Sequence, residues 1–156
     1  MRKNPLKDMV AKGHRIINGW VAIPSGFSTE IYASQGFDSV TIDMQHGASD
    51  PANAVELLQA VTAAGVTPMA RVPWNDAGVI QRVLDAGAYG IVCPMINTAA
   101  EAKAFVTAGR YPPIGSRSFG PFRAAQYGGA DYWQHANDEV LLFAMIETVT
   151  AVSNLD

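Results

Sequence analysis

The sequence contains a single cysteine, Cys93, which excludes an internal disulfide framework. Charged residues are also scarce, at 16% of the 156 residues, and the net charge of −3 excludes the basic field of a protein that binds nucleic-acid backbones. The sequence lacks an uninterrupted apolar run of about 18 residues, so no membrane-spanning segment is predicted. The lone thiol and the absence of a secretory leader pattern predict a cytoplasmic protein.

Lysine is rare too, and none of the lysines follows an apolar, strand-like run; they are Lys3, Lys7, Lys12 and Lys103. An enzyme that forms a Schiff base needs a desolvated lysine in its pocket, so imine chemistry is not expected. The sequence also lacks a glycine-rich dinucleotide fingerprint and a phosphate-binding loop. Nicotinamide and nucleotide chemistry are therefore not predicted.

Apolar residues make up 49% of the chain, enough for an ordinary folded core. They gather in five short runs: Ile17–Pro24, Ser39–Gln45, Thr67–Pro73, Tyr89–Met95 and Val140–Glu147. Several runs are apolar at consecutive positions, as is typical of strands buried on both faces of a parallel sheet. The sequence therefore predicts an α/β fold built from repeated strand–helix units.

The segments between these runs have helical signals. Thr98 and Glu101 have the spacing of a capping box, and Asp50-Pro51 predicts a helix start with proline in its first position. A buried helical stripe is predicted at Val79, Ile80, Val83 and Leu84. Glycines that favour a left-handed conformation are expected where the helices end, at Gly36, Gly65, Gly87 and Gly109.

The connection from Arg110 to Asp138 is long enough to have its own structure or to act over an active site. Its Arg117 and Arg123 could hold an anionic substrate, or could be solvated or paired at an interface. Asp85 could simply end its helix. Since neither a linker nor a low-complexity tract interrupts the chain, residues 1–156 are predicted to form a single domain.

Ionisable residues close several of the apolar runs: Asp43 and His46, Arg71 and Glu147. Burying an unpaired charge is costly, so these groups predict a polar pocket at the carboxyl edge of the sheet, where parallel β/α folds place their active sites. Asp43 could orient a basic His46, or cap a turn. Arg71 could stabilise negative charge on oxygen, or form a structural ion pair with Asp43 or Glu147.

Two further residues have alternative interpretations. Glu147 follows an apolar strand and could bind a hard divalent metal, although one carboxylate is a weak metal signal. Trp20 could line a pocket or belong to the core. Cys93, inside an apolar run, is predicted to be inert packing.

Taken together, ordered motifs along the chain resemble the HpcH/HpaI aldolase family of metal-dependent class II pyruvate aldolases. The matching segments are Gly19-Trp20, Gly36-Phe37-Asp38, Ile42–Gly47, Arg71-Val72-Pro73, Leu84–Ala88, Pro94–Thr98, Arg110–Pro113, Gly115–Ser118 and Ile146-Glu147-Thr148. The resemblance implies a (β/α)8 TIM barrel, of which this chain covers about the first five strands. It also implies a homo-oligomer, a hexamer by family resemblance.

The same resemblance assigns roles to matching positions. Glu147 matches a metal ligand, and Arg71 matches the arginine that contacts the keto oxygen of pyruvate. His46, oriented by Asp43, matches the catalytic base, and Trp20 lines the aldehyde side of the pocket. The cofactor implied is a divalent metal, Mg²⁺, Mn²⁺ or Co²⁺.

The chain departs from the family at two points. Many members have a glutamate where this chain has Gln45, which places a substrate-binding amide next to the base. The family's second metal ligand, an aspartate, would lie beyond Asp156, so the 156-residue chain is predicted to be C-terminally incomplete and inactive alone.

The expected reaction is metal-dependent, reversible cleavage of 4-hydroxy-2-oxo acids to pyruvate and an aldehyde. The expected partners are these small molecules, with neither nucleic acid nor membrane. One alternative is an acyl-CoA lyase similar to the citrate lyase β subunit. The other is a non-catalytic barrel fragment that acts in assembly.

Overall fold

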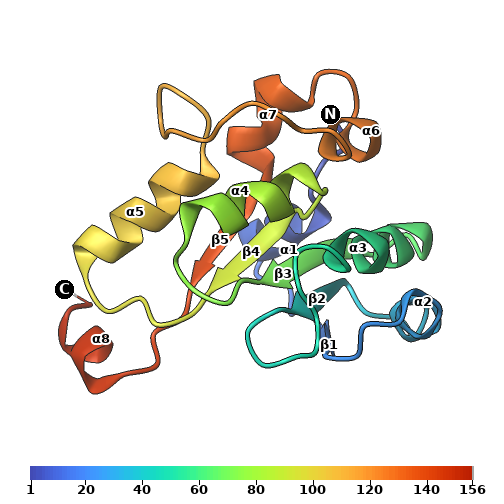
Figure 1. Ribbon diagram of the computed structural model, residues 1–156, viewed down its shortest axis with the longest axis horizontal. Helices are drawn as coiled ribbons and strands as arrows, with labels where there is room; N and C mark the ends of the chain where they lie inside the picture. Colours follow the sequence, from blue (N-terminus) through green and yellow to red (C-terminus); the bar gives the residue numbers. More distant parts are fainter. Residues whose placement is uncertain (156) are drawn as a thin grey trace.

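The computed structural model describes residues 1–155, which form one five-stranded sheet with helices packed on it (Figure 1). All neighbouring strands are parallel and follow chain order. The strands are β1 (Asn18–Val21), β2 (Ser39–Asp43), β3 (Thr67–Arg71), β4 (Gly90–Cys93) and β5 (Leu141–Ala144). The helices are α1 (Pro5–Ala11), α2 (Gly26–Ala33), α3 (Ala54–Ala63), α4 (Ala77–Asp85), α5 (Ala99–Gly109), α6 (Ala124–Gly128), α7 (Tyr132–Glu139) and α8 (Val149–Ser153).

Each strand lies inside one of the five predicted apolar runs, which confirms the predicted α/β fold. Each run extends beyond its strand at the carboxyl end by two or three residues. These residues leave the ladder and form the loops that lead into the following helices. The polar residues predicted at strand ends therefore stand at or just beyond one edge of the sheet.

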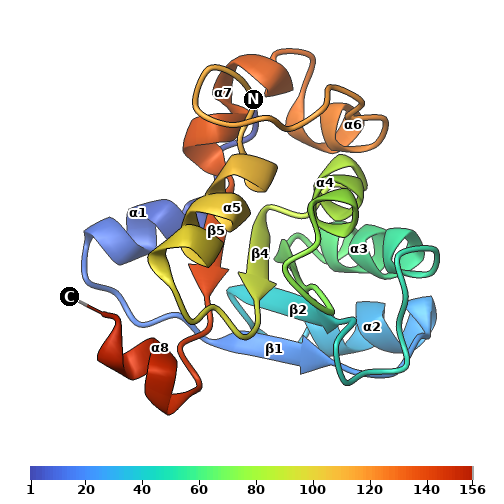
Figure 2. The same ribbon diagram turned by 60° about the vertical axis from the view of Figure 1, so that its left-hand side comes forward.

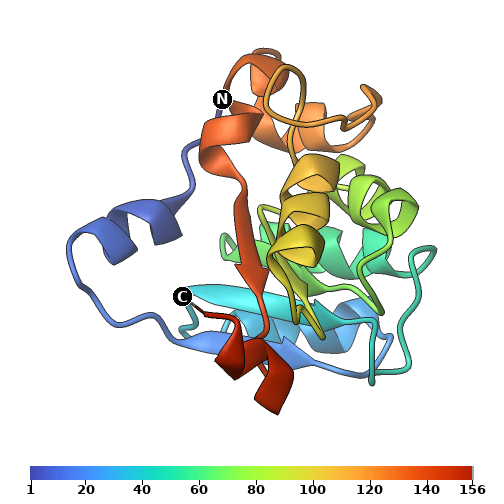
Figure 3. The same ribbon diagram turned by 90° about the vertical axis from the view of Figure 1, so that its left-hand side faces the viewer.

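The alternation of side chains along each strand separates two faces of the sheet. One face carries the main core, where strand residues pack against the helices; these include Val40, Ile42, Ala70, Ile91 and Leu142. The opposite face, called here the inner face, has a cavity of about 310 Å³ whose lining includes Leu6, Trp20, Met69, Val92 and Phe143. Helices α2, α3, α4 and α5 lie on the core side, whereas α1 lies on the other side (Figures 2 and 3).

The helix signals are largely confirmed. Thr98 and Glu101 form the predicted capping box at the start of α5, and the stripe on α4 packs into the core with Val79 only partly buried. The predicted start at Asp50-Pro51 is wrong: α3 begins at Ala54. The Asp50 carboxylate instead accepts the backbone amides of Ala52 and Asn53, so it caps a turn that precedes the helix.

Three of the four predicted helix-ending glycines, Gly36, Gly65 and Gly87, have positive φ angles. Gly109 is the last residue of α5, so the helix ends where it was predicted to end, but Gly109 does not have the predicted left-handed conformation. A Cβ atom at Gly109 would stand only 2.8 Å from Cδ1 of Leu142 in β5. A side chain at this position would therefore require the Leu142 side chain to shift.

The long connection before β5 has its own structure, which was one of the two predicted alternatives; the other was a role over an active site. Helices α6 and α7 lie at the end of the sheet where β5 begins, away from its carboxyl edge (Figure 2). A second apolar cluster holds them there; it contains Tyr89, Tyr111, Ala124, Tyr132 and Ala136.

The two arginines of this connection are buried, so the interpretation of them as solvated is wrong. Arg117 Nη2 donates to the Asp85 carboxylate at 2.7 Å, and its guanidinium stacks over the Tyr111 ring. Arg123 donates to the carbonyl of Ala86 and the hydroxyl of Thr62. Asp85 is the last residue of α4, and its carboxylate also forms an ion pair with the buried Arg117 guanidinium.

Within residues 1–155, β1 pairs only with β2 and β5 only with β4, so both outer strands keep an open edge. Phe143 on β5 and Trp20 on β1 remain partly exposed on the inner face. None of the helices described is both long and apolar enough to cross a membrane.

Candidate active site

Asp43 and Arg71 form a bidentate ion pair at the carboxyl edge of the sheet. The two residues are register partners on β2 and β3, so their side chains leave the sheet side by side. Arg71 Nε donates to Oδ1 of Asp43 at 2.9 Å, and Nη2 donates to Oδ2 at 2.6 Å. Both side chains are largely buried, with 5% of Asp43 and 12% of Arg71 exposed. The ion-pair alternative for Arg71 is therefore the one seen in the structure, with Asp43 as its partner.

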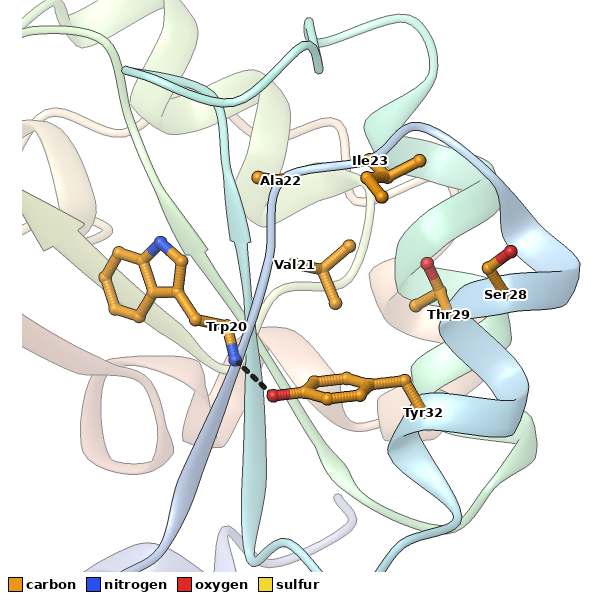
Figure 4. A pocket seen from close by; sticks show the side chains of 7 residues that line it. All are labelled: Trp20, Val21, Ala22, Ile23, Ser28, Thr29 and Tyr32. Atoms are coloured by element: carbon orange, nitrogen blue, oxygen red, sulfur yellow. Dashed lines mark hydrogen bonds between the residues drawn. The ribbon is translucent and has the colours of Figure 1, made fainter.

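Trp20 joins this pair from β1. Its indole Nε1 donates to Oδ2 of Asp43 at 3.1 Å, and the Arg71 guanidinium carbon lies 4.9 Å from the centre of the indole ring. Figure 4 shows the indole on the opposite side of β1 from Val21 and Tyr32, so it lies on the inner face of the sheet. The ring is 42% exposed, which fits a pocket wall better than a core residue.

A separate cavity of about 280 Å³ lies on the other side of β1, against α2. Its walls are mostly apolar, and they include Tyr32, whose hydroxyl accepts the backbone N–H of Trp20 at 3.4 Å (Figure 4). Asp43 and Arg71 do not line it. The cavity therefore shares Trp20 with the polar cluster but does not contain the ion pair.

The turn after β2 wraps around Asp43. The backbone amides of Gln45 and His46 both donate to Oδ1, at 3.0 and 3.2 Å. The predicted contact between Asp43 and the His46 imidazole is not present among the described residues: the carboxylate meets the main chain of His46, and the imidazole is exposed. Five donors already bind the two carboxylate oxygens, so no acceptor position is left for the His46 imidazole.

The charge of Asp43 is strongly stabilised by these contacts. Burial alone would raise the pKa of the carboxyl group, but hydrogen bonds from Arg71, Trp20, His46 and Gln45 together hold its pKa far below the usual range. Asp43 is therefore an anion at neutral pH. The neighbouring Gln45 has a buried side-chain oxygen without a hydrogen-bond partner within residues 1–155.

Glu147 stands at the same edge, three residues beyond β5, and is exposed. Its Oε1 accepts the backbone N–H of Met95 at 2.7 Å. Met95 follows β4 and has a φ of +57°, a conformation that side-chain-bearing residues rarely adopt. Sequence reasoning missed Met95, because a backbone donor in a left-handed conformation has no sequence signal when the residue is not glycine.

The donor set fits one part of a metal site. An exposed carboxylate with one oxygen fixed by a backbone amide and the other uncommitted suits a hard divalent cation. No group of three metal-ligating side chains occurs within residues 1–155. Glu147 would therefore hold a metal only together with ligands from elsewhere.

The structure thus gathers Trp20, Asp43 and Arg71 into one hydrogen-bonded cluster, called here the Asp43 cluster. His46 and Gln45 are attached to it through their backbone amides. Glu147 lies at the same edge without a hydrogen bond to the cluster among the described residues.

Comparison with known proteins adds independent evidence. The family model described as HpcH/HpaI aldolase/citrate lyase matches residues 18–156. The chain is 39% identical to a hydroxypyruvate/pyruvate aldolase of Rhizorhabdus wittichii and 41% identical to a 4-hydroxy-2-oxovalerate aldolase of Novosphingobium aromaticivorans, in each case over 98% of this chain. A solved HpcH/HpaI family protein from Burkholderia cenocepacia matches 97% of the chain with a TM-score of 0.89 and 32% identity.

These matches also define how much of the fold is present. The chain spans 61% and 59% of the two curated relatives and 62% of the solved structure. Its five parallel strands are therefore a partial barrel, as the sequence predicted. The chain belongs to the HpcH/HpaI aldolase/citrate lyase family.

Proposed function

We propose that the natural protein reversibly cleaves 4-hydroxy-2-oxo acids to pyruvate and an aldehyde. The observation that carries this proposal is the Asp43 cluster, which presents a fixed cation beside an aromatic wall at the carboxyl edge of the sheet. The names of the relatives support a pyruvate-forming reaction. The family description also includes citrate lyase, but no feature of the Asp43 cluster favours a coenzyme A substrate.

Arg71 has the geometry to bind the oxygen that becomes negative. Its hydrogen bonds within residues 1–155 use Nε and Nη2, which leaves Nη1 for an oxygen of the substrate. When the C3–C4 bond breaks, its electron pair moves into the pyruvate half and charge builds up on the keto oxygen. A guanidinium held in place before the reaction stabilises that charge without reorganising.

His46 is proposed as the group that moves the proton. Its imidazole is exposed beside the cluster and can approach a substrate hydroxyl. In cleavage, an imidazole nitrogen takes the proton of the 4-hydroxyl as the aldehyde carbonyl forms, and a proton then returns to C3 to give pyruvate. A positioned acid–base group typically contributes about 10²–10⁴-fold in rate.

Glu147 is proposed to hold a divalent metal together with a ligand outside this chain. When bound, such a metal supplies Lewis-acid stabilisation of the oxygens of the 2-oxo acid. Trp20 and Gln45 are proposed to line the substrate side. The 156-residue chain alone is proposed to be inactive.

The test is pyruvate release from 4-hydroxy-2-oxo acids of different chain length by the full-length natural protein. Turnover should fall on treatment with EDTA and return with Mg²⁺, Mn²⁺ or Co²⁺. His46→Ala should lower kcat, whereas Asp8→Asn, on the exposed side of α1, should not. Absence of pyruvate from every substrate would refute the reaction, and unchanged turnover in EDTA would refute the metal requirement.

A further inference from the structure

We infer that Asp43 is a positioning residue whose two oxygens have different roles: Oδ1 holds the turn after β2 and Nε of Arg71, and Oδ2 joins the Arg71 guanidinium to the Trp20 indole. The inference rests on the proposed function and adds to it. It replaces the expected role of Asp43 as a partner of the His46 imidazole.

The two oxygens accept different sets of donors, with Arg71 contacting both. Oδ1 accepts the backbone amides of Gln45 and His46, together with Nε of Arg71. Oδ2 accepts only side-chain donors, Nη2 of Arg71 and Nε1 of Trp20. The first set fixes the main chain of the turn and one end of the Arg71 guanidinium, and the second set joins Arg71 to Trp20 on the inner face of the sheet.

The Oδ2 contacts couple Arg71 to Trp20. One oxygen receives both donors, and the guanidinium also lies over the indole ring at 4.9 Å. Neither side chain can rotate without losing its bond to Oδ2. Because Nε and Nη2 are both anchored, the direction of the remaining Nη1 is fixed by the plane of the guanidinium. Asp43 therefore positions the cation and the aromatic wall as one unit.

The substitution Asp43→Asn separates the two roles. Its amide oxygen can replace Oδ1 and keep the backbone amides of the turn. Its amide NH₂ then stands where Oδ2 was and faces two other donors, from Arg71 and Trp20. The variant therefore keeps the turn, whereas Nη2 of Arg71 and Nε1 of Trp20 lose the acceptor that they share.

The kinetic test uses the full-length natural protein and the pyruvate-release assay. Asp43→Asn should lower kcat by about 100-fold, the scale of a misplaced reacting group, with a smaller change in KM. The double variant Asp43→Asn/Arg71→Lys should be no worse than Arg71→Lys alone, since both remove the same unit. Additive losses would overturn the inference. A shift of the acid limb of the kcat/KM profile in Asp43→Asn would also overturn it, because that result assigns Asp43 to the imidazole.

A spectroscopic test does not depend on activity. In a Trp74→Phe/Trp133→Phe background, Trp20 is the remaining tryptophan of residues 1–156. Adding Asp43→Asn should change the Trp20 emission and increase its quenching by acrylamide, since the indole loses its anchor. The control is Asp38→Asn, because the Asp38 carboxylate accepts the backbone N–H of Ile17 and does not contact Trp20. Adding this substitution should leave the quenching unchanged. Equal quenching with and without Asp43→Asn would overturn the inference.

A second variant covers the case in which Asp43→Asn does not fold. Arg71→Gly leaves the carboxylate in place, so millimolar guanidinium chloride should restore part of the lost turnover. Absence of rescue would overturn the positioning role. If the wild-type protein released no pyruvate, the proposed reaction would fail while the quenching result still decided the role of Asp43.

Discussion

The backbone amide of Met95 holds Oε1 of Glu147 at 2.7 Å, which ties the loop after β4 to the loop after β5. The bond fixes one oxygen of an otherwise exposed carboxylate. Met95 keeps this position at the cost of a left-handed backbone, and such strain is typically found where the surrounding structure holds a functional group in place. Glu147 is therefore presented in a defined orientation.

Glu147→Gln should keep the bond to Met95, because the amide oxygen still accepts the N–H. It should nevertheless lose a charged metal ligand, so Mn²⁺ affinity and pyruvate release should fall more than about 100-fold, since groups that merely orient ligands already contribute 10–100-fold. Isothermal titration with Mn²⁺ and the pyruvate assay measure the two effects. Glu30→Gln, an exposed carboxylate on α2, is the matched control, and equal affinity in both variants would contradict the assignment of Glu147.

Asp85→Ala should be strongly destabilising. The Arg117 side chain is fully buried, so the variant leaves its charge without the Asp85 carboxylate. Breaking one side of a buried pair costs about 3–5 kcal/mol, whereas Arg82→Ala, an exposed position on the same helix, should change stability by less than about 0.5 kcal/mol. Urea unfolding measures both. The double variant Asp85→Ala/Arg117→Met should recover much of the loss; a double variant as unstable as the single one would contradict this account.

The low pKa of Asp43 makes stability depend on pH. The folded state holds this carboxyl group ionised, so its contribution is complete above its unfolded pKa of about 3.9 and is lost as the pH falls from there toward the lower folded value. Urea midpoints should therefore decline below about pH 4. Asp43→Asn should flatten this decline, whereas Asp8→Asn should not. An unchanged slope in Asp43→Asn would show that other carboxylates dominate acid unfolding.

Cys93 should be unreactive in the folded protein. Burial raises the pKa of its thiol to about 12, so the thiolate is nearly absent at neutral pH, and the side chain has no measurable exposure. Iodoacetamide at pH 8 should leave the folded protein unmodified by mass spectrometry and should alkylate it after denaturation. Rapid alkylation without denaturant would mean that β4 opens readily.

The sequence was sufficient to predict the five parallel strands and the edge at which polar residues gather. Apolar runs and helix caps are local signals, and they fix the alternation of strand and helix. The partner of Asp43 could not be predicted in the same way, because the choice between Arg71 and the His46 imidazole depends on strand register. Once Asp43 and Arg71 are register partners, the guanidinium reaches the carboxylate first.

Two other features were beyond sequence reasoning for related reasons. Gly109 ends α5 without the predicted left-handed conformation, and its close neighbour is Leu142, a distant residue on β5. Arg117 and Arg123 resemble surface arginines, but contacts with distant residues bury them, among them Asp85 for Arg117 and Thr62 for Arg123. Each error arises where a long-range contact overrides a local pattern.

The burial of Arg117 and Arg123 at the end of the sheet opposite Asp43 has a practical consequence for engineering. Substitutions intended to change folding stability can be concentrated around α6 and α7, whereas substitutions intended to change substrate specificity can be concentrated around Trp20 and Gln45. Since the two regions occupy opposite ends of the strands, libraries at one end can be combined with libraries at the other with little interference.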